Sequence, residues 1–141
     1  MKFLVGCAPS GEVTFISEMF GGRTTDTEIT IQSGFINLVE PLDEILGDKG
    51  FPEIDTSLSE HGGILIIPPF KRNEKGFQFT AKQIDDAYKI ARVRIHVERC
   101  IRRLKIFEIL HYVHHEMIDQ IDDVLRIIAG LSNISNDLIR E

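Results

Sequence analysis

Two acidic residues occupy positions at which carboxylates could do chemistry. Asp48 follows a short apolar stretch within residues 44–51, and Glu98 lies fifty residues later within the arginine-rich residues 94–105. Carboxylate oxygens are hard ligands of the kind that Mg²⁺ and Mn²⁺ prefer. Two such ions, about 3.5–4 Å apart, can hold the attacking and leaving oxygens of a phosphodiester. Asp48 and Glu98 are therefore candidate metal ligands, and candidate catalytic residues, of a phosphodiester-cleaving site.

The residues before Asp48 predict a short strand. Residues 44–46 are apolar enough to be buried, and Gly47 to Gly50 form a turn-prone sequence. This places Asp48 at the carboxyl end of a strand, where α/β proteins commonly bind ligands. Residues 63–67 predict a second buried strand, which stops at Pro68 because proline has no N–H to continue the ladder.

Glu98 falls on a predicted long helix. Thr80 and Gln83 have the spacing of a capping box, which predicts a helix over residues 81–104. Its expected apolar side consists of Ile84, Ala87, Ala91, Ile95 and Val97, and its second half carries many cations around Glu98. The cations proposed to contact nucleic-acid phosphates, without reading base sequence, are Arg99, Arg102, Arg103 and Lys105.

The remaining segments predict a mixed α/β domain. Residues 2–8 and 12–18 flank a turn at residues 9–11 and predict a hairpin. Thr25 and Glu28 form a second capping box, so a helix should follow and break near Gly34. Residues 117–131 repeat apolar side chains at helical spacing and predict a final amphipathic helix. A chain of 141 residues is long enough for one domain.

Composition excludes several classes of partner. A net charge of -6 and a pI near 5.4 argue against attraction of the whole molecule to nucleic acid, although a local basic surface can still supply it. No apolar stretch approaches the roughly 18–20 residues of a membrane span, so we expect a soluble protein with no membrane partner. Cys7 and Cys100 are isolated, which favours an intracellular, reducing compartment and a role as small buried hydrophobic residues.

Several short motifs occur in one order and carry a family resemblance. They are residues 3–6, 8–17, 21–23, 47–51, 67–70 and 94–99. Together, from about residue 2 to about residue 131, they resemble the catalytic domain of the Harbinger-type DDE transposases and their domesticated, THAP-associated relatives. The resemblance implies a ribonuclease-H-like fold, a divalent metal cation (Mg or Mn), DNA as partner, and a location in the nucleus.

The resemblance also assigns residues. The family uses two aspartates and a glutamate, and the positions that match the second aspartate and the glutamate are Asp48 and Glu98. The first aspartate belongs to a central strand just upstream of the segment that resembles residues 2–4. Residues 1–141 are therefore expected to be an N-terminally truncated, partial domain that lacks this strand and is inactive alone. Open strand edges would favour self-association, and DNA targeting would need an accessory DNA-binding protein.

Other interpretations remain open. Spacing alone favours ion pairs of Glu98 with Arg94 and Arg102, worth about 0.2–0.5 kcal/mol each. Asp48 could be a turn residue that bonds its own backbone. The chain could be a noncatalytic, domesticated DNA-associated or protein-interaction domain, and it could be a gene-model fragment, a decayed copy or a functional short protein. The histidines at 111, 114 and 115 are interpreted as surface residues and not as metal ligands.

Overall fold

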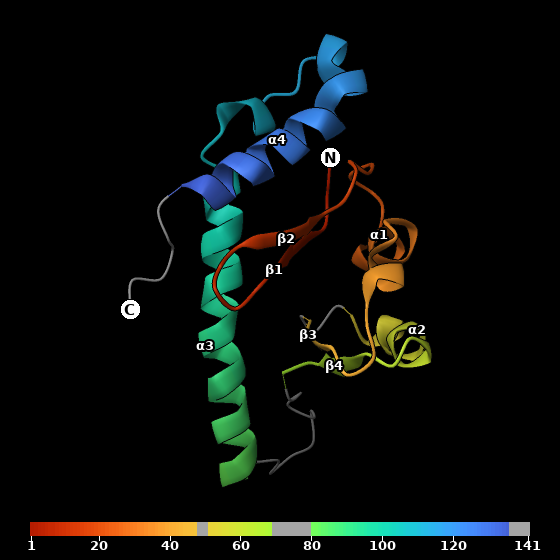
Figure 1. The fold of residues 1–141 in the computed structure, drawn as a ribbon, viewed down its shortest axis with the longest axis vertical. Helices are drawn as coiled ribbons and strands as arrows, with labels where there is room; N and C mark the ends of the chain where they lie inside the picture. Colours follow the sequence, from red (N-terminus) through yellow and green to blue (C-terminus); the bar gives the residue numbers. More distant parts are fainter. Residues whose placement is uncertain (48–50, 69–79, 136–141) are drawn as a thin grey trace.

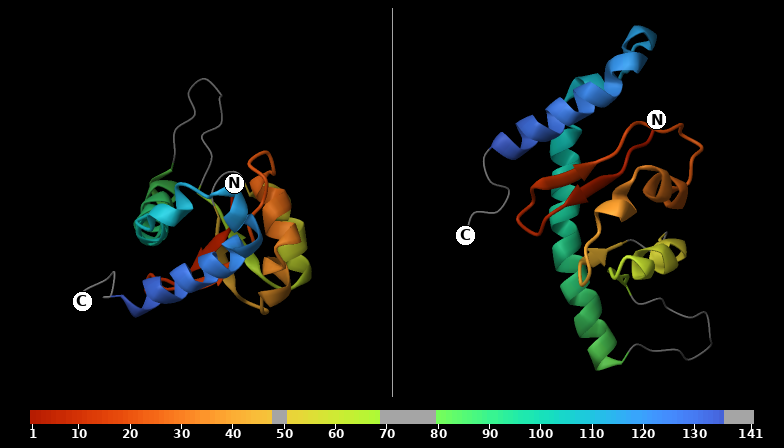
Figure 2. Two further views of the ribbon diagram at one scale, coloured as in Figure 1. Left: turned by 90° about the horizontal axis from the view of Figure 1, so that it is seen from above. Right: turned by 45° about the vertical axis from the view of Figure 1, so that its right-hand side comes forward.

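The computed structural model describes residues 1–47, 51–68 and 80–135. Two small sheets lie between a long helix on one side and two short helices on the other (Figures 1 and 2). The strands are β1 (Val5–Cys7), β2 (Val13–Ile16), β3 (Glu44–Leu46) and β4 (Ile64–Ile66), and the helices are α1 (Asp26–Gln32), α2 (Asp55–Glu60), α3 (Ala81–Leu104) and α4 (Ile121–Ile134). This mixture of helices and small sheets agrees with the predicted α/β class.

The predicted hairpin is confirmed. Strands β1 and β2 pair antiparallel, with Val5 opposite Ile16 and an irregular register after Gly6. A hydrogen bond of 2.9 Å from Gly11 N to the Ala8 carbonyl oxygen closes the turn. Gly11 has φ 90°, a conformation that glycine adopts without steric cost.

The two predicted strands on either side of α2 are also present. Strands β3 and β4 pair parallel, with Ile45 opposite Leu65. Helix α2, which the sequence analysis did not predict, provides the crossover between them, and Leu58 from this helix is fully buried. Parallel neighbours require such a crossover connection. The two sheets are separate, because β1 pairs with β2 and β3 pairs with β4 in the described part of the chain.

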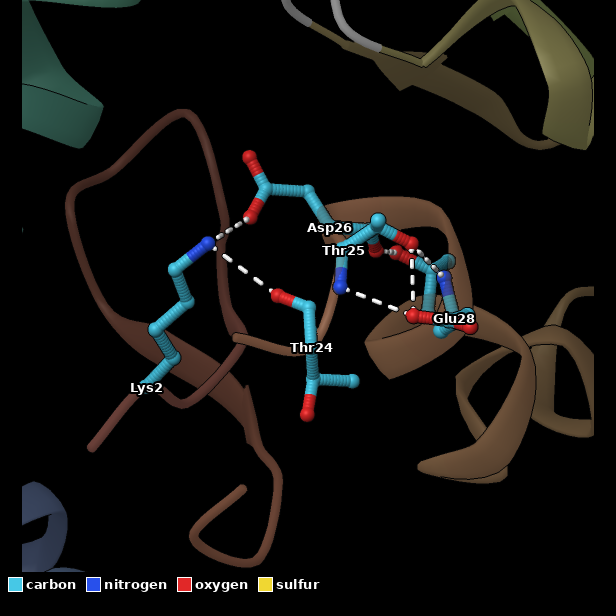
Figure 3. A network of polar contacts seen from close by, with 6 residues as sticks. Lys2, Thr24, Thr25, Asp26 and Glu28 are labelled. Carbon is cyan, nitrogen blue, oxygen red and sulfur yellow. Dashed lines mark hydrogen bonds and ion pairs between the residues drawn. The ribbon is translucent and has the colours of Figure 1, made fainter. Parts of the chain in front are cut away.

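Both predicted capping boxes are present. In α1, the Thr25 hydroxyl accepts from Glu28 N, and the Glu28 carboxylate accepts from Thr25 N at 2.9 Å (Figure 3). In α3, Thr80 and Gln83 make the equivalent reciprocal bonds, and the helix spans residues 81–104 as predicted. Reciprocal capping satisfies backbone N–H groups that have no partner within the helix.

The final helix begins later than predicted. Residues 115–120 form a 3₁₀ segment, and α4 runs from Ile121 to Ile134 and not over 117–131. The shift follows the buried face, because Ile121, Leu125 and Ile128 are buried whereas Ile118 is 39 % exposed. Three further 3₁₀ segments are Phe35–Leu38, Pro52–Ile54 and Glu108–Leu110.

The prediction of which side of α3 is buried is only partly correct. Ile84 and Ile95 are exposed, and the buried residues of this helix are Cys100 and Leu104. The C-terminal part of α3 packs against α4 and the hairpin, whereas its N-terminal turns extend past both sheets (Figure 1). No helix in residues 1–47, 51–68 and 80–135 is long and apolar enough to cross a membrane.

The described residues form two core clusters. One joins the hairpin to α3 and α4, with Val13, Leu104 and Ile128 among its buried residues. The other lies beneath β3 and β4 and contains Ile36, Ile54 and Leu58. Phe15 of the hairpin and Phe35, which packs against the second cluster, make an edge-to-face contact with ring centroids 5.2 Å apart. This contact joins the hairpin to the second cluster.

Candidate active site

A cleft of about 980 Å³ separates the two sheets. Strand β1 and the residues before it form one border, and residues 43–47, which include β3, form the opposite border. Helix α3 forms one wall through Ile90, Val93, Val97 and Ile101, while Ile29, Thr30 and Phe35 contribute to another. The cleft therefore lies where the open sides of both sheets meet the long helix.

Glu98 lies at this cleft. It is on the face of α3 that also carries Val97, Ile101 and Lys105 into the lining. Its side chain is 66 % exposed, and Oε1 lies 3.4 Å from Arg94 Nε, one helical turn earlier. The ion pair expected from spacing is thus present with Arg94, and it engages one carboxylate oxygen of the candidate ligand.

Asp48 lies outside the described residues. Its preceding neighbour Gly47 is described, and this residue follows β3 and lines the same cleft as Glu98. Gly47 N donates to the Ile66 carbonyl at 2.9 Å, which extends the pairing of β3 and β4 by one residue. The chain therefore reaches the cleft immediately before Asp48.

The four candidate phosphate-contacting residues do not share one surface. Lys105 lines the cleft, seven residues and about two helical turns after Glu98. Arg99 and Arg102 are exposed and are not part of the cleft wall. Arg103 is half-buried, and its Nη1 donates to the Ser132 carbonyl at 3.0 Å, so it connects α3 to α4.

The donor chemistry at Glu98 fits a divalent cation, because its carboxylate oxygens are hard ligands. Across residues 1–47, 51–68 and 80–135, no group of three or more His, Cys, Asp or Glu side chains is arranged to hold a metal ion. Within these residues His111 is exposed, with Nε2 2.7 Å from the Lys105 carbonyl oxygen. The described part of the chain thus supplies one of the candidate ligands.

Sequence reasoning missed His96 as a residue of the cleft. His96 lies two positions before Glu98, a spacing at which helical side chains face different directions. The structure nevertheless places both in the cleft lining. The Nδ1 atom of His96 is buried and has no hydrogen-bond partner among the described residues. A buried ring nitrogen usually has a partner, which makes His96 notable.

The two cysteines meet beside the cleft. Cys7 on β1 and Cys100 on α3 are free, and both belong to the cluster that joins the hairpin to α3. A hydrogen bond between the two thiols raises the pKa of Cys7 and lowers that of Cys100. Cys100 is buried and Cys7 half-buried, which agrees with their interpretation as small core residues. Nothing in their separate sequence positions predicts this contact.

Comparison with known proteins identifies a family. Residues 1–133 match the family described as DDE superfamily endonuclease, which is most of the chain. This family has a ribonuclease-H-like fold and typically uses divalent metal ions. No significant match was found among curated proteins or among solved structures.

Proposed function

The chain belongs to the DDE superfamily of endonucleases, and on this premise we propose that it is a transposase-derived, Harbinger-type nuclease domain in which Asp48 and Glu98 are metal ligands. The observation that supports the proposal is the position of Glu98 and of Gly47, the residue that precedes Asp48. Glu98 and Gly47, the neighbour of Asp48, line the same cleft from different elements. A rigid helix and the end of a strand are suitable supports for ligands whose geometry must be maintained.

The proposed reaction is cleavage of a DNA phosphodiester. A divalent cation, Mg²⁺ or Mn²⁺, would supply Lewis-acid stabilisation of the charge on the phosphate oxygens. Glu98 would contribute a carboxylate oxygen to that cation after release from Arg94. Arg99, Arg102, Arg103 and Lys105 are the proposed contacts to the DNA backbone, with Lys105 closest to the cleft along the Glu98 face of α3.

We propose that the chain is inactive alone. Its family uses three acidic ligands, and this chain provides matches to two of them. No position of residues 1–141 matches the family's first aspartate, so a site built on Asp48 and Glu98 would lack a third acidic ligand. The nuclear location and an accessory DNA-binding protein are further parts of this proposal, and both derive from the family.

A nicking assay tests the proposal. The chain and a version extended by the upstream coding sequence would be incubated with supercoiled plasmid in Mg²⁺, Mn²⁺ or EDTA. We expect metal-dependent nicking only by the extended protein and at least a hundredfold loss in Asp48→Asn or Glu98→Gln. Asp85→Asn is the matched control, because Asp85 forms a similar i,i+4 ion pair with Lys89 on α3 but does not line the cleft.

Two results would contradict the proposal in different ways. Nicking by the 141-residue chain that disappears in both cleft variants would show that two carboxylates suffice. An extended, folded protein that neither nicks DNA nor binds Mn²⁺ in electron paramagnetic resonance titrations would exclude the metal-dependent nuclease.

The alternative is a noncatalytic, DNA-associated or protein-interaction domain. The 3.4 Å pair between Arg94 and Glu98 favours it, because a carboxylate used as an ion-pair partner serves helix α3 without a metal. DNA binding that depends on salt but is unchanged by EDTA and by Asp48→Asn would support this function over nuclease activity.

A further inference from the structure

The two free cysteines lie in one packed layer between the hairpin and the long helix. Cys100 of α3 is fully buried in the hydrophobic cluster against which Val5 and Cys7 of β1 pack. Alternate residues of a strand point to the same side, so the face of β1 that carries Val5 and Cys7 lies on α3. Figures 1 and 2 show the hairpin crossing this helix. The contact is therefore made by a face of the hairpin and not by the open edge of β1.

The two thiols contact each other directly. A hydrogen bond joins the side chains of Cys7 and Cys100. A disulfide requires the two sulfur atoms to come within about 2.05 Å of each other. Because the sulfur atoms are already hydrogen-bonding neighbours, this approach is chiefly a movement of two short side chains, and β1 and α3 keep their places.

Metal binding is a poorer use of this pair. Cysteine thiolates hold zinc together with further cysteine, histidine or carboxylate ligands, usually four in total. In the described ranges 1–47, 51–68 and 80–135, no three or more such side chains are arranged around one point. The arrangement therefore favours chemistry between the two sulfur atoms themselves.

An oxidant can reach the pair from the side of Cys7. Cys7 is half-buried, whereas Cys100 is buried. A small molecule such as a peroxide can therefore approach the thiols without opening the core. In reducing compartments, disulfides are usually transient and serve catalysis or redox sensing. A reversible bond fits such a compartment better than a permanent one.

We propose that Cys7 and Cys100 form a reversible disulfide when the chain encounters a peroxide, which links β1 to α3. The sulfur of one thiol attacks a peroxide oxygen, so an S–O bond forms, the O–O bond breaks, and the thiol proton leaves with the other oxygen as water. The second thiol then attacks the first sulfur, so the S–S bond forms, the S–O bond breaks, and its proton leaves in a second water. The sulfur atoms are oxidised and the peroxide oxygens are reduced.

The disulfide would stabilise the fold by restricting the unfolded chain. It closes a loop from residue 7 to residue 100, which contains both sheets and the two short helices. A cross-link over a long loop removes conformational freedom mainly from the unfolded state. We expect the thermal midpoint of the oxidised chain to lie about 5–15 °C above that of the reduced chain. This property requires neither metal nor DNA and goes beyond the proposed nuclease.

Peptide mapping of the 141-residue chain tests the proposal. The chain would be treated with hydrogen peroxide at low protein concentration, alkylated with a maleimide, and digested with trypsin without reduction. The two cysteines are the only ones in the sequence, and they fall in the tryptic peptides 3–23 and 100–102. We expect a monomer on a non-reducing gel and a linked pair of these peptides, which dithiothreitol separates.

Matched variants test the geometry of the pair. Cys7→Ala should abolish the linked peptides. The double variant Cys7→Ala/Ala8→Cys keeps two thiols and nearly the same loop length, but it moves one thiol to the opposite side of the strand. This variant should also form no linked peptides, and circular dichroism would show that each variant is folded.

A redox equilibrium provides a measurement that needs no variant. The fraction of linked chain would be measured in glutathione buffers, both in native conditions and in concentrated urea. If the fold holds the two thiols together, the equilibrium constant for the disulfide should be at least about tenfold larger in the native chain.

Four results would overturn the proposal. These are linked dimers in place of a linked monomer, oxidation of Cys7 to the sulfinic acid without linked peptides, equal linkage in the double variant, or a disulfide no more stable in the native chain than in urea. None of these measurements involves DNA cleavage. Failure of the proposed nuclease would therefore leave the disulfide unaffected, and failure of the disulfide would leave the proposed nuclease unaffected.

Discussion

Glu98 has a partner on its own helix. Its distance of 3.4 Å from Arg94 is that of an ordinary exposed i,i+4 pair. Pairs of this kind contribute only about 0.3–0.5 kcal/mol. A divalent cation could therefore displace Arg94 at small cost to the stability of α3. The ion pair and the proposed ligand role are compatible, because the first is weak enough to be exchanged for the second.

Glu28 gives a prediction about pH. Hydrogen bonds from the backbone N–H and hydroxyl of Thr25 lower the pKa of Glu28 below its ordinary value of 4.5. The capping carboxylate thus contributes stability above its unfolded-state pKa, and that contribution is lost as pH falls through the lower folded-state pKa. We expect Glu28→Gln to be less stable than the unmodified chain at neutral pH, with a difference that shrinks on acidification below pH 4.5.

Urea unfolding at a series of pH values measures this difference. Glu40→Gln, at an exposed glutamate outside the cap, is the control and should show no comparable change of its stability difference with pH. A Glu28→Gln difference that stays constant across the acid range would mean that the capping charge does not contribute to the fold.

Among the helices and strands, those whose defining contacts are made between residues close in the sequence were predicted most accurately. The capping residues Thr25, Glu28, Thr80 and Gln83 give the starts of α1 and α3 because the bonds that satisfy a helix end are made within four residues. The hairpin could be predicted for the same reason, because its paired strands β1 and β2 are joined by a short turn. The candidate ligands Asp48 and Glu98 came from the ordered motifs of the family and not from their spacing.

Features that depend on distant contacts were not predicted. The start of α4 is determined by which face becomes buried against the hairpin, and residues 117–120 have helical periodicity without that burial. Ile84 and Ile95 are apolar but exposed, because the part of α3 that is buried begins only at Cys100. The cleft position of His96 depends on where two separate sheets end. None of these facts is encoded in a short window of sequence.

The attachment of α4 to the hairpin gives a prediction for an element contact. Asn133 Oδ1 accepts from Val13 N at 2.8 Å, and Asn133 Nδ2 donates to the Val13 carbonyl at 2.9 Å. The amide thus pairs with β2 as a neighbouring strand would. Asn133→Ala leaves both backbone groups unpaired and should lower the free energy of unfolding by about 1–3 kcal/mol.

Denaturant unfolding with an unchanged m-value would identify this loss as reduced stability. Asn37→Ala replaces an exposed asparagine and should change stability by less than about 0.5 kcal/mol. An Asn133→Ala variant as stable as this control would show that water replaces the amide without cost.

For DNA binding by the whole molecule, the distribution of charge matters more than the net charge. The chain is acidic overall, with a net charge of -6, while Arg99 and Arg102 are exposed near the end of α3. We expect weak, salt-sensitive DNA binding. Replacing both arginines with alanine should reduce the slope of log K against log salt by about 1 for each phosphate that the protein no longer neutralises.

Anisotropy titrations of a labelled duplex at several salt concentrations measure this slope. Lys82→Ala, an exposed cation at the start of α3 and distant along the helix, is the control. Arg103→Ala differs from both, because it removes the bond to the Ser132 carbonyl and should also lower stability. A slope unchanged in the double variant would exclude Arg99 and Arg102 from the DNA-binding surface.

The two core clusters predict that the halves of the molecule unfold separately. Leu58 packs with Ile36 and Ile54, and Leu104 packs with Cys100 and Ile128, and the cleft lies between the two sheets that these clusters support. Leu58→Ala should cost about 2–5 kcal/mol and accelerate amide hydrogen exchange in α2, β3 and β4 more than in α3 and α4. Leu104→Ala should give the reverse pattern. The Phe15 and Phe35 rings provide a contact across the molecule that would limit this independence. Uniform acceleration in both variants would mean that the fold is one cooperative unit, whereas separate responses would mean that the two core clusters unfold independently.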